Sequence, residues 1–339
     1  MPFDPSRDPV LAALGWDDRL SAHWSLTDPR LVPGRVVQVD RGQCTVATAH
    51  GAVRARCGPV AVGDWVGFDP GERGVVAVLP RTGVLERRAP GRETAVLVLA
   101  ANIDLVFVAH AADRGVNLRR LERELVVAWD AGARPVVLLT KADACADLDR
   151  EMAAASEVSI GADVLAVSAL AGLGLDDVSA LLVPGRTVVL VGASGAGKST
   201  LLNALAGADV QLVQAVRDAD GRGRHTTSAA RLVTLPGGAL LIDTPGIRSI
   251  GLWDGDGLQQ AFADIEALAA ECRFGDCEHV TEPGCAVRGV VDDARVAGWR
   301  KLRREVERTA ADRAGWQKAE EHRRRRAFGR AVRAHRYRP

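Results

Sequence analysis

The amino-acid sequence predicts three successive domains: a small all-β barrel, an α/β domain on a doubly wound parallel sheet, and a C-terminal α-helical domain that contains metal-binding residues. The apolar pattern changes twice along the chain. Short alternating runs give way near Ala95 to β-branched runs separated by amphipathic helices. Beyond Trp253 come a predicted helix, a cysteine-rich stretch and then long helical segments rich in Arg and Glu. With 339 residues, 47% of them hydrophobic, the chain can bury more than one core.

The predicted barrel rests on five short runs of period two, separated by Gly, Pro or Asp. Such runs are typical of half-buried strands, and five in succession predict a small barrel. We place this domain at residues 31–89, after an N-terminal extension of residues 1–30. The five runs span residues 34–39, 44–47, 53–56, 64–68 and 74–79.

The α/β domain is placed at residues 90–253, where six apolar runs alternate with amphipathic segments. This alternation is typical of a doubly wound parallel sheet. Its last boundary lies near Gly251 to Gly257, where glycine and aspartate accumulate, so the C-terminal domain takes residues 254–339. The six runs lie near residues 105–110, 136–140, 164–168, 188–191, 231–235 and 240–243.

A phosphate-binding loop (P-loop) is the strongest single motif. Residues 192–199 read Gly-Ala-Ser-Gly-Ala-Gly-Lys-Ser, between an apolar run and a predicted helix at Thr200 to Ala206, which is the context this motif requires. The glycines let backbone N–H groups curl around phosphates. Lys198 offers a cation to the β and γ oxygens, which also makes it a catalytic residue, and the Ser199 hydroxyl suits Mg²⁺. The predicted contacts are Gly192, Ala193, Ser194, Gly195, Ala196, Gly197, Lys198, Ser199 and Thr200.

A second phosphate-reading motif follows about forty residues later, as Asp-Thr-Pro-Gly at the end of an apolar run. Asp243 is predicted to hold the shell of the Mg²⁺ ion, and the N–H group of Gly246 to sense the γ-phosphate. An Asp-x-x-Gly sequence alone is a weak signal. At this distance after a P-loop it becomes a strong one.

Two further motifs point to guanine. Thr140-Lys141-Ala142-Asp143 ends an apolar run, and the Asp143 carboxylate can accept from the ring N–H and the exocyclic amine of guanine, a pattern that adenine lacks. The Lys141 stem can lie along the base. Ser168 and Ala169 end another run and can present a backbone N–H to the guanine oxygen. Each motif alone is more often an ordinary strand end, but together with the P-loop they predict GTP rather than ATP.

These motifs occur in an unusual order, because the guanine-reading residues precede the phosphate-reading ones. The same sheet can still form, since strand order in space need not follow order in the chain. The sequence therefore predicts a circularly permuted P-loop GTPase domain, with new termini just after Gly246 and just before the strand at Leu105. We expect motion of the segment after Gly246 to pass directly into the C-terminal domain.

Three cysteines and a histidine lie within fourteen residues of the C-terminal domain. Three thiolates and an imidazole complete a tetrahedral zinc site with no open position, so the site would be structural. The alternative is a loop of reduced cysteines without metal. The three other cysteines are scattered, which favours metal binding in a reducing compartment over disulfides. The predicted zinc ligands are Cys272, Cys277, His279 and Cys285.

The chain has no apolar stretch near the roughly 20 residues needed to span a bilayer. Its N-terminus lacks a basic region followed by an apolar core. We expect a cytoplasmic protein without a membrane partner.

The permuted motif order, the Gly-Arg-Gly-Arg-His-Thr-Thr stretch at residues 221–227, the Cys-x4-Cys-x-His-x5-Cys cluster and the preceding barrel together resemble one family. It is the family of small-ribosomal-subunit-dependent GTPases of the RsgA type, and the resemblance runs from about Leu31 to the tail. The resemblance implies an OB-fold barrel and a GTP hydrolase that is stimulated by the small ribosomal subunit and acts in its late maturation. It also implies GTP or GDP, Mg²⁺ and one structural Zn²⁺ as cofactors. We expect a monomer.

Two positions depart from the usual motifs. Thr140 stands where Asn is usual, which puts in question the bridge from this side chain to the base and to the P-loop. Ile247 follows Gly246 where Ras-like enzymes have a glutamine that orients water, a task that an aliphatic side chain cannot perform. The resemblance points instead to His225, with Thr226 or Thr227 closing on Mg²⁺ beside Ser199 and Asp243. Binding of RNA or solvent is the alternative for His225.

The C-terminal tail is strongly basic. From Arg300 to Pro339 the chain has 15 Lys and Arg against 5 Asp and Glu, a charge of +10 in a protein whose net charge is +1. Such a run is often only a solvated segment. Beside a barrel and a zinc cluster it favours contact with rRNA phosphates.

Three classes of function fit these motifs to different degrees. The first is an enzyme, a slow GTPase whose hydrolysis releases it from the small subunit. The second is a nucleotide-gated RNA-binding module with incidental turnover. A metabolic P-loop kinase or ATPase is disfavoured by Asp143 and by the lack of a recognisable acceptor-substrate site.

Overall fold

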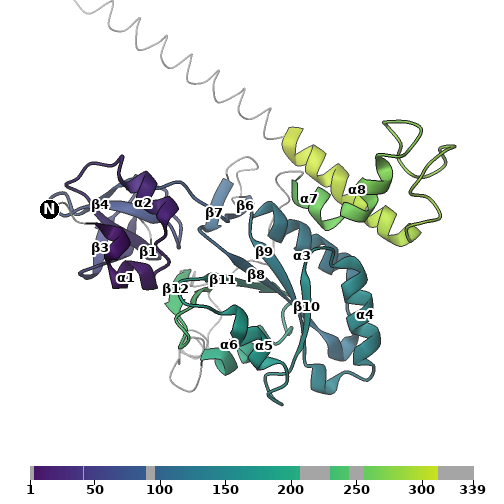
Figure 1. The fold of residues 1–339 in the computed structure, drawn as a ribbon, viewed down its shortest axis with the longest axis horizontal. Coiled ribbons are helices and arrows are strands. Elements are labelled where there is room, and N and C mark those ends of the chain that lie inside the picture. Colours follow the sequence, from purple (N-terminus) through teal and green to yellow (C-terminus); the bar gives the residue numbers. More distant parts are fainter. Residues whose placement is uncertain (1–3, 41, 89–95, 207–229, 244–255, 312–339) are drawn as a thin grey trace, which may run out of the picture.

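The computed structural model describes residues 4–40, 42–88, 96–206, 230–243 and 256–311 (Figure 1). A small β-domain, an α/β domain and a helical domain follow one another along the chain, as the sequence predicts. Five predicted positions lie outside the described residues, as does the basic tail beyond residue 311. They are His225, Thr226, Thr227, Gly246 and Ile247.

The five predicted strands of the barrel are confirmed. Strand β1 pairs antiparallel with β2 and with β4, which closes the sheet on itself. Strand β5 joins β3 to β4 on the other side. The interior is filled by the inward residues of these strands, among them Val36, Val46 and Val66. The strands are β1 (Val32–Asp40), β2 (Gln43–Thr48), β3 (Gly51–Arg56), β4 (Trp65–Asp69) and β5 (Gly74–Val78).

The N-terminal residues before β1 fold onto the barrel. They form η1 (Pro5–Arg7), α1 (Pro9–Ala13) and α2 (Asp18–Trp24). The Asp8 and Asp17 side chains cap α1 and α2 by accepting from backbone N–H groups. The Trp16 ring lies edge-on to Trp65 of β4, with centroids 4.9 Å apart. The helices thus share a small apolar core with the barrel, centred on these rings.

The α/β domain contains all six predicted strands in the spatial order β10-β9-β8-β11-β13-β12. The first five are parallel, whereas β12 runs antiparallel because a short hairpin joins it to β13. A two-stranded sheet of β6 (Leu85–Arg88) and β7 (Val96–Ala100) precedes them and was not predicted. The six are β8 (Leu105–Ala111), β9 (Arg134–Thr140), β10 (Asp163–Val167), β11 (Thr187–Gly192), β12 (Arg231–Thr234) and β13 (Leu240–Asp243).

Helices cover both faces of this sheet (Figure 1). Along β8, Val106 and Val108 face one core, while Leu105 and Phe107 face the other. The first core packs under α3 (Leu118–Asp130) and α4 (Leu148–Val158), and the second under α5 (Leu175–Leu181) and α6 (Lys198–Ala206). Short 3₁₀ turns η2 (Ala112–Arg114) and η3 (Ala142–Ala144) follow β8 and β9.

One buried arginine joins the barrel to the α/β domain. The Arg35 side chain on β1 is 1% exposed, and burial lowers its pKa to about 10. Its guanidinium donates to the Leu14 carbonyl at 2.5 Å, the Asn102 carbonyl at 3.1 Å and the Thr187 hydroxyl at 2.8 Å. This one side chain therefore contacts the N-terminal helices, the barrel and strand β11, beside the antiparallel pairing of β1 with β12 and a hydrogen bond of 2.9 Å from the Asn102 amide to the Gly63 carbonyl.

The C-terminal domain packs against α3 (Figure 1). It comprises α7 (Asp256–Ala261), α8 (Ala263–Ala269), a loop with the four predicted zinc ligands, and a helix whose described part spans residues 293–311. The buried Arg295 guanidinium contacts Glu122 of α3 at 2.9 Å and Asp264 of α8 at 2.8 Å. Among the residues described, no helix has the length and apolar character needed to cross a membrane.

Candidate functional site

The carboxyl ends of the parallel strands bring the predicted nucleotide motifs to one edge of the sheet. The strand register pairs Thr140 of β9 with Val167 of β10 and with Ala111 of β8. It also pairs Gly192 of β11 with Ala109 of β8. The loops that follow these four strands therefore meet outside the same edge, which is where open α/β sheets bind their ligands.

The P-loop has the backbone that its glycines permit. Gly192, Gly195 and Gly197 have φ angles of +138°, +80° and +74°. A Cβ atom on Gly192 would lie 2.3 Å from the Ala109 carbonyl oxygen, so this position admits no side chain. The Lys198 ammonium donates to the carbonyls of Gly192 at 2.8 Å and Ala193 at 2.6 Å, which keeps its charge beside the loop.

Thr140 connects the guanine motif to the P-loop. Its hydroxyl lies 2.8 Å from the Ala196 carbonyl oxygen and 3.2 Å from that of His110. A hydroxyl donates one proton, and the shorter contact is the one to the P-loop. The side chain is 4% exposed. The bridge to the P-loop that the departure from Asn put in question is therefore present, made by a hydroxyl.

Lys141 and Asp143 follow at the same edge. The Lys141 backbone adopts the left-handed conformation, with φ +56°, and its ammonium lies 3.0 Å from the Asp113 carboxylate on η2. Asp143 is exposed and has no hydrogen bond or ion pair among the described residues, so its carboxylate is available to a ligand. Their expected roles at the base stay predictions.

The Ser168–Ala169 turn is closed by local hydrogen bonds. The Ser168 hydroxyl accepts from the Ala171 N–H at 3.1 Å, and the Ser168 N–H donates to the Leu173 carbonyl at 2.9 Å. Ser168 is buried and Ala169 half-buried. These bonds fix the direction of the backbone at the end of β10.

The predicted magnesium residues within the described chain lie at strand and helix ends. Ser199 and Thr200 are in the first turn of α6, and Asp243 is the last residue of β13, with its side chain exposed. The N-terminal end of α6 faces the loop, where unpaired N–H groups favour anions. Sequence reasoning missed Asp113, whose only signal was a charged residue shortly after a strand.

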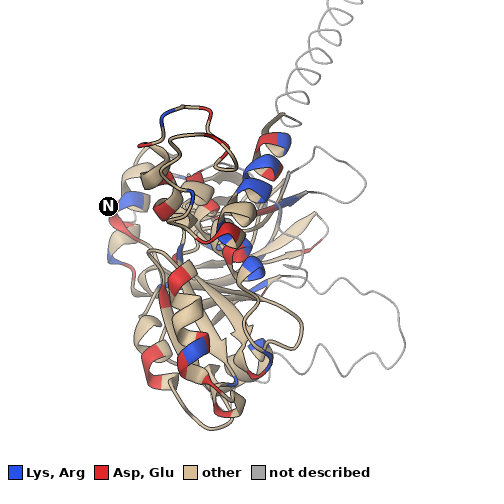
Figure 2. Cartoon of the chain, turned by 90° about the vertical axis from the view of Figure 1, so that its right-hand side faces the viewer, with Lys and Arg blue, Asp and Glu red and all other residues tan. Residues whose placement is uncertain are grey.

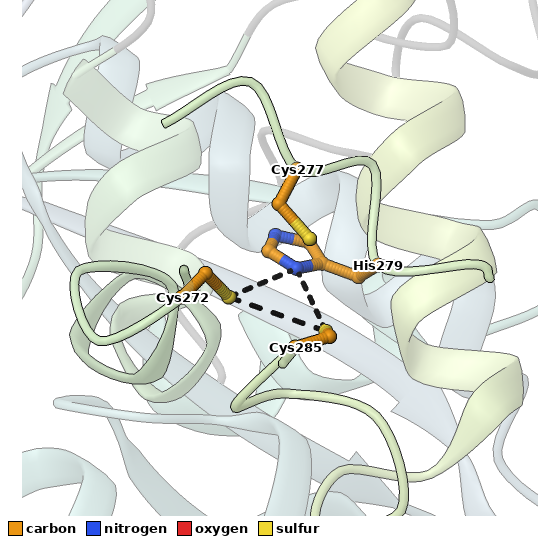
Figure 3. Close-up of side chains that lie close together, drawn as sticks. All are labelled: Cys272, Cys277, His279 and Cys285. Atoms are coloured by element: carbon orange, nitrogen blue, oxygen red, sulfur yellow. Dashed lines mark hydrogen bonds between the residues drawn. The ribbon is translucent and has the colours of Figure 1, made fainter. Parts of the chain in front are cut away.

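The four predicted zinc ligands converge in the C-terminal domain (Figure 3). Their ligand atoms all lie within 4.8 Å of one another. The His279 Nδ1 atom is 3.6 Å from Cys272 Sγ and 3.4 Å from Cys285 Sγ, and these two sulfurs are 4.0 Å apart. A tetrahedral zinc would separate sulfur from nitrogen by about 3.6 Å and sulfur from sulfur by about 3.8 Å. The donor set and its spacing fit zinc.

The surroundings of the cluster favour the ligand form of His279, whereas burial disfavours the thiolate form of Cys277 in the absence of a cation. Burial, and then the Arg303 charge, lower the pKa of His279, which favours the neutral imidazole that a metal ligand requires. Burial raises the pKa of the Cys277 thiol to about 11, which a bound cation would reverse. Backbone N–H groups of Ala286 and Arg288 point at the sulfurs of Cys272 and Cys285, each at 3.4 Å.

The predicted zinc ligands and their loop contact the helix whose described part spans residues 293–311. The His279 ring lies 5.2 Å from the Trp299 ring. Glu278, between two of the ligands, forms ion pairs with Arg300, Arg303 and Arg304 of that helix. Lys and Arg positions, coloured blue, recur along its described part (Figure 2). A metal bound here would stabilise the attachment of the basic helix.

Comparison with known proteins identifies relatives over nearly the whole chain. The RsgA GTPase family model matches residues 78–253. A protein of Streptomyces coelicolor named small ribosomal subunit biogenesis GTPase RsgA is 45% identical, with 96% of each chain covered. A protein of that name from Streptomyces avermitilis is 46% identical over 91% of this chain and 89% of its own.

Solved structures agree with the fold. The crystal structure of YjeQ from Thermotoga maritima superposes with a TM-score of 0.60 at 25% identity, covering 81% of this chain and 98% of that one. That of YloQ, described as a circularly permuted GTPase, gives 0.58 at 24% identity, covering 82% and 95%. The order of strands and motifs, the site at the sheet edge and these similarities agree: the chain belongs to the RsgA GTPase family.

Proposed function

We propose that this protein is a GTPase that binds the small ribosomal subunit and acts in its late maturation, with GTP hydrolysis coupled to its release. The relatives named for small ribosomal subunit biogenesis support the process. The observation that carries the activity is the meeting of the P-loop with the loops after Thr140 and Val167 at one edge of the sheet.

The phosphates and the base of the nucleotide are assigned to two sides of this edge. On the phosphate side, the P-loop N–H groups and the Lys198 ammonium bind the β- and γ-phosphates. Ser199 and Asp243, with Thr227, would hold Mg²⁺, which when bound neutralises charge on the phosphates. On the base side, the Asp143 carboxylate accepts from guanine, and the N–H at Ala169 donates to its oxygen. Gly246 and Thr226 complete the predicted contacts.

Hydrolysis needs a group that orients the attacking water, and Ile247 cannot do so. We assign this role to His225. The replacement His225→Ala should leave GTP affinity nearly unchanged, because the base and phosphate contacts remain, and should lower the subunit-stimulated rate at least about tenfold. Single-turnover hydrolysis with and without small subunits measures the rate, and titration with a non-hydrolysable GTP analogue measures the affinity. Full stimulation in the variant would show that another group orients the water.

One structural zinc per chain completes the proposal. The four ligands leave no open position, so the ion contributes to folding of the C-terminal domain and takes no part in hydrolysis. The basic helix attached to this domain and the basic tail after it would contact rRNA phosphates as the protein docks. We also propose that the protein acts as a monomer in the cytoplasm.

Cosedimentation tests the partner. The protein is mixed with small subunits, large subunits or whole ribosomes, in the presence of GDP or a non-hydrolysable GTP analogue. We expect binding to small subunits with the analogue and release with GDP. Hydrolysis should rise when small subunits are added, because a partner that holds His225 in place lets this residue orient the water. Binding that depends on the nucleotide, without stimulation of hydrolysis by small subunits, would favour the alternative of a nucleotide-gated RNA-binding module with incidental turnover.

A further inference from the structure

The ion pair between Asp113 and Lys141 has no part in the function described above. Lys141 belongs to the guanine motif, whereas Asp113 lies on η2, which follows the neighbouring strand β8. Lys141 Nζ is 3.0 Å from Asp113 Oδ2, and the two side chains are 34% and 21% exposed. The pair therefore sits at the sheet edge where the base is expected, partly shielded from water.

The loop that carries Asp113 is held at both ends. Strand β8, which precedes this loop, pairs with β9 so that Ala111 lies opposite Thr140. Beyond Asp113, the Val116 N–H donates to the Glu151 carboxylate of α4 at 2.6 Å. The Asn117 side chain then caps α3 by accepting from the Arg120 N–H at 3.0 Å. The Asp113 carboxylate is thus fixed relative to the strand that ends in the guanine motif.

Lys141 is the principal partner of this carboxylate. The second oxygen, Asp113 Oδ1, is buried and has no hydrogen-bond partner in the part of the chain that the structure describes. A buried carboxylate oxygen without a donor is unfavourable, so the nearby ammonium provides most of its stabilisation. The same attraction holds the end of the flexible lysine side chain in place.

We propose that Asp113 is a positioning residue for guanine-nucleotide binding, which holds the Lys141 ammonium so that the lysine stem lies ready along the base. The inference rests on the proposed function, since it takes Lys141 to contact guanine. A lysine stem that is already held loses less conformational entropy when the nucleotide binds. Because GDP and GTP share the base, Asp113 should affect the affinity for both to the same extent.

The variant Asp113→Asn keeps the size of the side chain and removes its charge. We expect the dissociation constants of GDP and of a GTP analogue to rise about tenfold, the size expected for a partly buried charged hydrogen bond. The turnover rate at saturating GTP and the preference for GTP over XTP should not change. The control is Asp163→Asn, which breaks an exposed ion pair with Arg134 on the same sheet. It should bind nucleotide as the wild type does.

A double-mutant cycle separates positioning from stability. Lys141→Met keeps an apolar stem without the ammonium, so adding Asp113→Asn to it should weaken binding little further. Asp113→Glu keeps the charge and should restore most of the nucleotide affinity. This variant keeps the test possible if Asp113→Asn does not fold.

Two outcomes would overturn the inference while the wild type binds GTP. In the first, Asp113→Asn binds GDP and the GTP analogue within twofold of the wild type, even if its melting temperature is lower. In the second, the effects of Asp113→Asn and Lys141→Met on these dissociation constants simply add in the double variant. A wild-type protein that binds no guanine nucleotide would overturn the proposed function together with the inference.

Discussion

Replacing Thr140 by Val tests whether the contact between the guanine motif and the P-loop matters for binding. The two side chains have nearly the same shape, but Val lacks the hydroxyl that donates to the Ala196 carbonyl at 2.8 Å. Thr140 is 4% exposed and Ala196 2%. Water therefore has little access to take the place of the lost donor.

The size of the effect follows from this burial. A neutral hydrogen bond contributes about 1 kcal/mol net, and leaving a buried carbonyl without that donor raises the loss towards about 2 kcal/mol. If the bond holds the P-loop in its binding conformation, this free energy appears in nucleotide affinity. The dissociation constant of GDP should then rise roughly five- to thirtyfold.

Equilibrium titration with a fluorescent GDP analogue measures this change. Thr140→Ser is the matched control, because it keeps the hydroxyl and loses only a methyl group, and it should bind nearly as tightly as the wild type. Thermal unfolding of the three proteins without nucleotide shows how much of the loss is general stability. Equal affinity of the Val variant and the wild type would refute a role for this bond in binding.

Three further predictions concern the base, the metal and the domain interface. Asp143→Asn should weaken GTP and shift preference towards XTP, whose donor pattern no longer suits a carboxylate; an unchanged ratio of the two dissociation constants would remove Asp143 from the base site. Cys277→Ser should lower the zinc content, measured by elemental analysis of protein purified without chelator, from about one per chain towards zero, whereas Cys145→Ser should retain it. Arg295→Met should lower the free energy of unfolding by about 3–5 kcal/mol, because it leaves Glu122 buried without this counter-ion. Burial raises the pKa of Glu122 above 4.5 in the folded state, so acid favours folding through this group. The loss, measured by denaturant unfolding, should shrink as the pH falls towards 4.5, and an equal loss at pH 7.5 and pH 5 would contradict it.

The strands of both β-containing domains were predictable because their signal is local. A period of two, or a β-branched run between helices, needs only neighbouring residues, and all eleven predicted runs are strands. The position of the nucleotide motifs follows in turn, because parallel strands end at one edge. The direction in which each strand runs within the sheet was harder to predict from the sequence. Strand β12 is antiparallel owing to its short hairpin with β13, whereas the sequence predicted a parallel sheet.

The contacts that join the parts of the chain were not predictable, since each unites residues far apart in sequence. Thr140 meets Ala196 across 56 positions, and Arg35 meets Thr187 across 152. A single sequence marks Arg35 only as a charged residue in a strand, which would ordinarily be taken for a solvent-facing side chain. Its burial is explained by the folded protein, in which the barrel packs against the α/β domain and backbone carbonyls accept hydrogen bonds from the guanidinium.

The docking of the C-terminal domain changes how motion at the phosphate side could reach it. Residues 244–255 connect Asp243 to α7 along the chain, and α7 is fixed to α3. The Gly257 N–H donates to the Asp130 carboxylate at 2.8 Å, and a Cβ atom on Gly257 would lie 2.4 Å from the Val126 carbonyl oxygen.

Such close backbone contact leaves α7 no room to move without α3. Helix α3 begins just beyond the loop that carries Asp113, on the base side of the nucleotide site. The C-terminal domain is therefore linked to the site twice, through residues 244–255 from the phosphate side and through α3 from the base side. Motion passed from the segment after Gly246 to this domain would also have to move α3 or break the contacts at Gly257, and its direct transmission along the chain stays a prediction.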